Sequence, residues 1–157
     1  MKIDWKKLLI CLAVPLTVGG LSALLSGGGM QDYQGLNQPP LAPPGWVFPV
    51  VWTILYLLMG YASYRVLTSG ADRDEIKKAL SLYGIQLFLN FLWSPVFFGL
   101  QWRLVAFFIL VAMWVLIYLT IRAFSKIDER AGDFLLPYLL WVTFAGYLNL
   151  GVYILNR

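Results

Sequence analysis

Five apolar stretches dominate the sequence, and each is long enough to cross a lipid bilayer as a helix. They cover residues 8–26, 46–67, 79–100, 104–121 and 134–155. About 20 apolar residues in a helix span the roughly 30 Å of hydrocarbon in a bilayer. If a chain of 157 residues, 60% of them apolar, were soluble, it would expose apolar patches larger than those that soluble monomers carry. The sequence therefore predicts an all-α integral membrane protein, a five-transmembrane-helix bundle forming one domain over residues 1–157.

Positive charges are distributed unevenly between the two ends of the predicted helices. Arg103 and Arg157 fall on one side of the five-span arrangement. The remaining cations share the side of the amino terminus: Lys2, Lys6, Lys7, Arg65, Arg73, Lys77, Lys78, Arg122, Lys126 and Arg130. Because cytoplasmic loops are rich in Lys and Arg, we expect a cytoplasmic amino terminus. The short region before the first span favours a bacterial cytoplasmic membrane, with other membranes left open.

The first apolar stretch has a second interpretation. Lys6 and Lys7 precede it, and it contains the small residues Ser22 and Ala23, as a secretory signal peptide would. We favour a membrane helix, because removal of this stretch would leave a bundle of only four helices.

Several kinds of function are excluded by what the chain lacks. The net charge of +4 comes from short clusters between apolar runs, without a basic face for a phosphate backbone, so we expect no nucleic-acid partner. Cys11 is the single cysteine and has no partner for an internal disulfide. The absence of histidine removes imidazole ligation of haem, Ser-His-Asp catalysis and the common metal sites, so we expect no metal. No ionisable residue lies well inside a span, which argues against a proton-coupled pump.

The connection over residues 27–45 is the only long one. It starts with three glycines at 27–29 and carries proline pairs at 39–40 and 43–44, so we expect it to be too polar and too broken for helix. A loop of this length can fold over the end of the bundle. Inside the spans, Pro15 and Pro95 are expected to kink the first and third helices.

Aromatic and amide side chains recur at helical spacing on three of the spans. The second span places Phe48, Trp52 and Tyr56 on one face, the third places Asn90, Trp93 and Phe97, and the fifth places Trp141, Ala145 and Asn149. Uncharged amides in hydrocarbon face the protein interior, because an unsatisfied amide in lipid is costly. Two interpretations are equally supported at this point: the amides join helices, or they line an aromatic pocket.

The chain resembles the translocator protein family (TspO/MBR), also called tryptophan-rich sensory proteins or peripheral benzodiazepine receptors. The likeness runs from about Tyr33 to the carboxyl terminus. It rests on Tyr33-x-x-Leu36-x-x-Pro39 with Pro43-Pro44-Gly45 and Trp52, on Leu89-Asn90-Phe91-Leu92-Trp93-Ser94 with Phe97-Phe98, and on Leu136-Pro137-Tyr138 with Trp141, Phe144-Ala145 and Leu148-Asn149. The chain departs from the family pattern at Asp32, Gln38 and Leu41.

The resemblance implies a five-helix bundle around a pocket, closed by the 27–45 loop and often homodimeric. It implies tetrapyrroles such as protoporphyrin IX or haem, sterols and benzodiazepine-type drugs as ligands, with no cofactor required. Carried over by position, the ligand-binding residues are Tyr33, Pro43, Phe48, Trp52, Tyr56, Asn90, Trp93, Phe97, Trp141, Ala145, Leu148 and Asn149. A weak sterol-type pattern is formed by Leu150, Tyr153 and Arg157.

Three functional hypotheses follow from the residues and the resemblance together. The first is a membrane receptor or carrier that binds tetrapyrroles by stacking on Trp52 and Trp141. The second is light- and oxygen-dependent porphyrin degradation, with these two indoles as the candidate catalytic groups. The third is a lipid- or sterol-binding regulator that acts through a partner.

Overall fold

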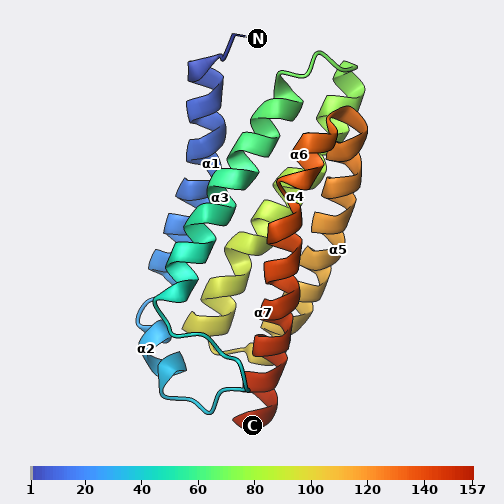
Figure 1. Cartoon of the computed structure of the whole chain (residues 1–157). Helices are drawn as coiled ribbons and strands as arrows, with labels where there is room; N and C mark the ends of the chain where they lie inside the picture. The colour runs from blue at the N-terminus through green and yellow to red at the C-terminus, as the bar shows by residue number, and fades with distance from the viewer. Residues whose placement is uncertain (1) are drawn as a thin grey trace.

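The computed structural model describes residues 2–157 and is built from helices. The five long ones are α1 (Trp5–Leu25), α3 (Val47–Leu67), α4 (Arg73–Ser94), α5 (Arg103–Ile127) and α7 (Leu136–Leu155). Two short helices, α2 (Gly29–Gln34) and α6 (Glu129–Asp133), and a π-helical turn η1 (Pro95–Gly99) complete the described part. Five helices in this part are long and apolar enough to cross a membrane, and they run side by side (Figure 1). The all-α, five-helix membrane fold is confirmed.

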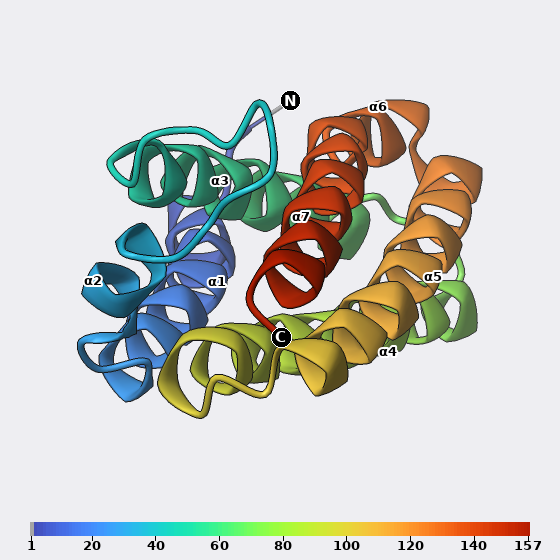
Figure 2. The ribbon, with the colours of Figure 1, turned by 90° about the horizontal axis from the view of Figure 1, so that it is seen from below.

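The helices surround a small core and turn most of their apolar surface outward. Viewed along the bundle, α7 lies between α3 and α5, and α4 closes the opposite side next to α1 (Figure 2). Buried side chains such as Met59, Met113 and Phe124 fill the centre. Leu24 and Leu140 are 77% and 70% exposed, although both are large and apolar. Such exposure is expected where hydrocarbon, and not water, is the solvent.

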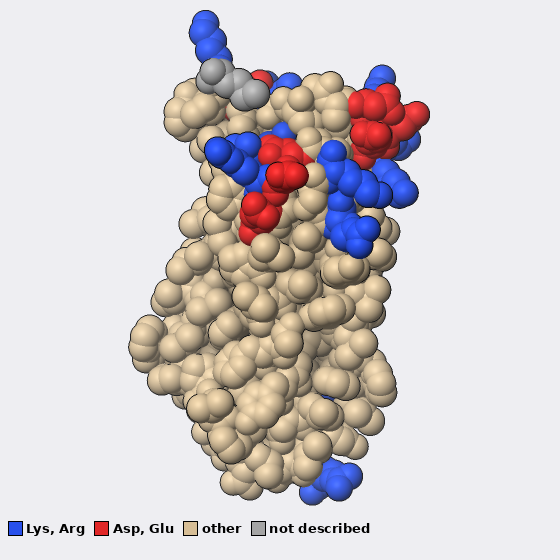
Figure 3. Space-filling model, turned by 45° about the vertical axis from the view of Figure 1, so that its right-hand side comes forward, with Lys and Arg blue, Asp and Glu red and all other residues tan. Residues whose placement is uncertain are grey.

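Charged residues gather at one end of the bundle. On the face seen in Figure 3, every acidic side chain and most basic ones lie at the end that carries the amino terminus, and a tan band without charge covers the rest. One separate basic group lies at the opposite end, where Figure 1 places the carboxyl terminus and α2. We call these the charged end and the lid end. Their separation agrees with helices that cross a bilayer.

The expectation that residues 27–45 contain no helix is wrong. Residues Gly29–Gln34 form α2, because burial of one aromatic side chain outweighs the poor helix propensity of the glycines. Tyr33 is only 2% exposed and packs edge to face against Phe48 and Phe98, with ring centroids 5.9 and 5.5 Å apart. The rest of the connection is irregular up to α3. We call residues 27–45 the lid segment.

Several helix boundaries differ from the predicted spans. The fourth helix continues to Ile127, and the third begins at Arg73. Hydropathy locates the part of a helix inside hydrocarbon, whereas charged turns continue the same helix into the interface. At Pro95 the α-helix changes to the π-helical turn η1, as a missing backbone N–H would favour, while α1 is unbroken through Pro15.

Candidate functional site

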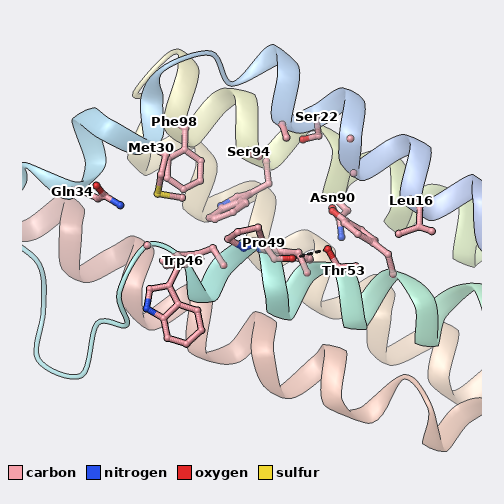
Figure 4. A pocket seen from close by; sticks show the side chains of 18 residues that line it. Leu16, Ser22, Met30, Gln34, Trp46, Pro49, Thr53, Asn90, Ser94 and Phe98 are labelled. Atoms are coloured by element: carbon pink, nitrogen blue, oxygen red, sulfur yellow. Dashed lines mark hydrogen bonds between the residues drawn. The ribbon is translucent and has the colours of Figure 1, made fainter.

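A cavity of about 520 Å³ lies between α1, α3 and α4 toward the lid end (Figure 4). Small-molecule sites have volumes of roughly 300–1,000 Å³, so this one has the size of a ligand site. The residues around it come from α1, the lid segment, α3, α4 and η1: Leu16, Gly19, Gly20, Ser22, Ala23, Met30, Gln34, Gly45, Trp46, Phe48, Pro49, Trp52, Thr53, Tyr56, Asn90, Trp93, Ser94 and Phe98.

Aromatic rings form one wall of this cavity. Trp52 stacks on Tyr56, with centroids 5.6 Å apart and an angle of 27° between the rings. Trp93 lies 6.4 Å from Trp52 and stacks on Phe97 at 5.1 Å and 19°. Indole and phenol rings offer flat apolar faces with few rotatable bonds, which favours stacking with a planar ligand.

Asn90 lies at the deep side of the cavity and belongs to a chain of buried hydrogen bonds. The Tyr56 hydroxyl donates to Asn90 Oδ1 at 2.9 Å, and Asn90 Nδ2 donates to the Tyr138 oxygen at 2.7 Å. The Tyr138 hydroxyl donates to Gln86 Oε1 at 2.7 Å, and Gln86 Nε2 donates to the Tyr83 carbonyl at 2.8 Å. The chain joins α3, α4 and α7, so Asn90 both connects helices and lines the cavity.

Apart from Leu16, the α1 side of the cavity is made of small residues. A Cβ atom at Gly19 would collide with the Tyr56 ring, so glycine lets this ring lie directly against α1. At Gly20 there is no atom within 4 Å of such a Cβ, and this residue also lines the cavity. Small side chains on α1 therefore leave the space that the aromatic wall of α3 and α4 faces.

The structure divides the predicted site residues into two groups. Five of them line the cavity: Phe48, Trp52, Tyr56, Asn90 and Trp93. Seven do not: Tyr33, Pro43, Phe97, Trp141, Ala145, Leu148 and Asn149. Of these seven, Tyr33 and Phe97 pack behind the wall, with ring centroids 5.7 Å apart.

The fifth-span residues form a second layer behind the aromatic wall. Trp141 meets Trp52 edge to face at 6.5 Å and 90°. Asn149 accepts a hydrogen bond from Trp93 Nε1 at 2.9 Å and donates to the Arg103 carbonyl at 2.8 Å, so this amide joins three helices. Ala145 is buried in the same layer. These side chains hold Trp52 and Trp93 in position without lining the cavity.

Sequence reasoning missed the contribution of α1. Leu16, Gly19, Gly20, Ser22 and Ala23 all line the cavity. The family likeness begins only at Tyr33, and none of these residues carries an aromatic ring or a side-chain amide. The one available signal was the Gly19-Gly20 pair inside an otherwise bulky apolar span, since glycine there permits close approach of another element.

The lid segment is fixed to the end of α7. Asn37 and Asn156 exchange two hydrogen bonds, from the Asn37 N–H to Asn156 Oδ1 at 3.0 Å and from Asn156 Nδ2 to the Asn37 carbonyl at 2.7 Å. The Tyr147 hydroxyl donates to the Pro40 carbonyl at 2.7 Å. Pro39 packs on Gly151, where a Cβ would collide with its ring. Figure 2 shows the segment crossing the lid end before it enters α3.

The fold and the cavity together define a class: a five-helix membrane protein with an aromatic cavity covered at one end by a segment of its own chain. Residues 11–155 match the TspO/MBR family, and the chain belongs to this family. It is 40% identical to the Tryptophan-rich protein TspO of Chlorobaculum tepidum over 150 residues, 95% of each chain. It is 40% identical to the Tryptophan-rich sensory protein of Cereibacter sphaeroides over 159 residues, 99% of this chain and 95% of that one. The Translocator protein of Bos taurus is 38% identical over 127 residues, 78% of this chain and 73% of that one.

Proposed function

We propose that the protein is a membrane receptor or carrier that binds a tetrapyrrole, such as protoporphyrin IX or haem, in the cavity between α1, α3 and α4. The observation that carries this proposal is the wall formed by Trp52, Tyr56 and Trp93, which lines a space of about 520 Å³. A flat, largely apolar macrocycle can stack on such a wall and exclude water from it. The names of two relatives, a sensory protein and a translocator protein, support a receptor or carrier role.

The polar edge of the ligand has a natural place near the lid segment. Gln34 is exposed and lines the cavity, and Figure 4 shows its amide on the same side as Met30. The oxygen and the nitrogen of the Asn90 side-chain amide already bind Tyr56 and Tyr138, so Asn90 is the weaker candidate for a polar ligand contact. We therefore place the apolar macrocycle against Trp52 and its polar substituents toward Gln34.

A fluorescence titration tests the proposal. Purified protein is titrated with protoporphyrin IX and, separately, with cholesterol, while Trp emission is recorded. We expect saturable quenching by the porphyrin, weakened in Trp52→Leu and unchanged in affinity in Trp5→Phe, whose ring is 64% exposed at the start of α1. Saturable binding of cholesterol alone would instead support the third hypothesis, a sterol-binding regulator.

A second candidate function is light- and oxygen-dependent porphyrin degradation. It is favoured by the contact of Trp52 with Trp141, because adjacent indoles give an oxidising equivalent a path away from the bound pigment. Light would excite the bound pigment, and molecular oxygen would be the oxidant that accepts its electrons. We also propose that the protein is a homodimer in a bacterial cytoplasmic membrane, with its amino terminus in the cytoplasm.

A further inference from the structure

A second cavity, of about 370 Å³, lies at the lid end between the start of α5 and the end of α7. It shares no lining residue with the aromatic cavity. Its walls come from two segments far apart in sequence: Gln101, Trp102, Arg103, Leu104, Val105, Val152, Tyr153, Asn156 and Arg157. Nothing in the proposed function uses this space.

Two arginines line this cavity, and they are the only cations that the charge pattern assigns to the lid end. Arg103 and Arg157 both contribute to its wall. The two ion pairs found within residues 2–157 join Lys7 to Asp4 and Arg65 to Asp128, so neither arginine is neutralised by a carboxylate contact there. A cavity with two guanidinium groups that make no ion pair within the described residues attracts anions at the membrane surface.

Arg103 has hydrogen-bonding capacity that the described residues do not use. Its Nε and Nη2 atoms are buried and have no hydrogen-bond partner in that part of the chain. Its guanidinium lies over the face of Phe97, 5.3 Å from the ring centroid. The acid on this end, Asp32, is exposed and accepts a hydrogen bond from Gln101 at 3.5 Å. Because these two atoms are enclosed by protein, Arg103 contributes its positive charge to the cavity wall through the part of its side chain that lines it.

The backbone at the start of α5 adds to the same field. Trp102, the residue before the helix, provides no side-chain hydrogen bond to the first turn. The amides of that first turn therefore present their partial positive charge next to the Arg103 side chain, on the wall of the same cavity. The helix end strengthens the attraction of the two arginines for an anion and does not define the site by itself.

The other walls are apolar. Leu104 and Val105 are 41% and 49% exposed and continue from the cavity along the lipid-facing side of α5. Trp102 is 58% exposed beside them, as indole rings are at the boundary of hydrocarbon and water. An inorganic anion would leave these apolar walls without a function, whereas an amphiphile would use both parts of the site.

We propose that this cavity binds the phosphate group of an anionic phospholipid, with the acyl chain lying along Leu104 and Val105. The positive charges of Arg103 and Arg157 on its wall suit a phosphate. The sterol-type pattern is divided by the fold: Tyr153 and Arg157 line this cavity, while Leu150 lines a separate groove between α5 and α7. The site is independent of the tetrapyrrole proposal, since the two cavities have different walls.

Native mass spectrometry of the purified full chain tests the site. Phosphatidylglycerol and phosphatidylcholine with the same acyl chains are titrated in parallel. Both lipids carry the phosphate, but the choline cation of phosphatidylcholine opposes the two arginines, so we expect retention of phosphatidylglycerol to exceed that of phosphatidylcholine by about tenfold. Arg103→Gln with Arg157→Gln should remove this preference. Equal retention of both lipids by the native chain would overturn the proposal.

Controls separate loss of the site from loss of the fold. Arg122→Gln changes an exposed arginine near the other end of α5, which hydrogen-bonds Tyr118, and should keep the lipid preference. Arg103→Lys keeps the charge and should retain part of it. Helix content by circular dichroism should be unchanged in all variants. If inorganic phosphate displaced phosphatidylglycerol at equal concentration, the site would bind free phosphate and the lipid assignment would be wrong.

Discussion

The indole rings of Trp52 and Trp141 meet edge to face, with centroids 6.5 Å apart, but only Trp52 lines the cavity. Trp141 Nε1 is buried and has no hydrogen-bond partner within residues 2–157. Trp93 differs, because its Nε1 donates to Asn149. Trp141 can therefore affect a bound ligand through the rings of Trp52 and Phe48, both of which line the cavity, and this makes it a sensitive test of binding against photochemistry.

The change Trp141→Phe should leave dark binding of protoporphyrin nearly intact. It keeps an aromatic ring behind Trp52 and removes an N–H group that has no partner in the described chain, so we expect an affinity loss of no more than about 1.5 kcal/mol. If Trp141 takes part in electron transfer, illuminated porphyrin should persist longer with the variant. Absorbance decay under light measures this. If native protein left the pigment as stable as free pigment, the degradation hypothesis would be abandoned.

Replacing Pro43 and Pro44 by Ala should loosen the return of the lid segment into α3. Proline restricts the backbone in the unfolded and folded chain alike, and its loss increases the conformational entropy of the segment. We expect faster ligand dissociation, measured by stopped-flow fluorescence, with unchanged helix content.

Asn156→Ala provides the comparison for this lid prediction. It removes the two hydrogen bonds that attach Asn37 of the lid segment to the end of α7, worth about 0.5–1.5 kcal/mol each. If dissociation were unchanged in both variants, the segment would be a simple connection.

Gly19→Ala should destabilise the protein, whereas Gly20→Ala should not. A Cβ at position 19 collides with the Tyr56 ring, and movement of this ring would strain its hydrogen bond to Asn90. Overpacking of this kind costs about 1–3 kcal/mol. Position 20 has open space around it. The melting temperatures of the two variants in detergent give the comparison, and equal values would show that α1 moves aside freely.

The Arg65–Asp128 pair should make stability depend on acid pH. Partial burial raises the pKa of the Asp128 carboxyl, but the hydrogen bond and charge of Arg65, 2.7 Å away, outweigh it and hold the pKa below the ordinary 3.8. A lowered folded-state pKa gives stability that is present above the unfolded value and is lost as the pH falls through the folded value. Thermal unfolding between neutral pH and pH 3 should show a loss of about 1 kcal/mol that is absent in Asp128→Asn. A loss of the same size in the variant would assign it to other groups.

The topology can be tested with introduced cysteines in a Cys11→Ser background. The positive-inside pattern places Arg157 outside the cell and Lys126 inside. An impermeant thiol reagent on intact cells should therefore label Arg157→Cys and spare Lys126→Cys. The reverse labelling pattern would invert the assigned orientation.

The sequence by itself determined the number of membrane helices and their approximate positions. Hydrocarbon about 30 Å thick requires some 20 apolar residues per helix and leaves no alternative pairing for backbone groups, so hydropathy alone locates each crossing. The inward direction of Asn90, Trp93 and Asn149 was also predictable, and all three are buried. An amide cannot face lipid without a partner, and this rule applies to each helix separately.

Only the tertiary structure decided which inward residues line a cavity and which support it. Asn149 and Trp141 share a predicted inward face with residues of the other helices, yet they lie behind Trp93 and Trp52. Gly19 and Gly20, which have no side chain to show a preference, form part of the cavity. The rotation and offset of packed helices depend on the whole set of interdigitating side chains, so they are not encoded in the periodicity of any single span.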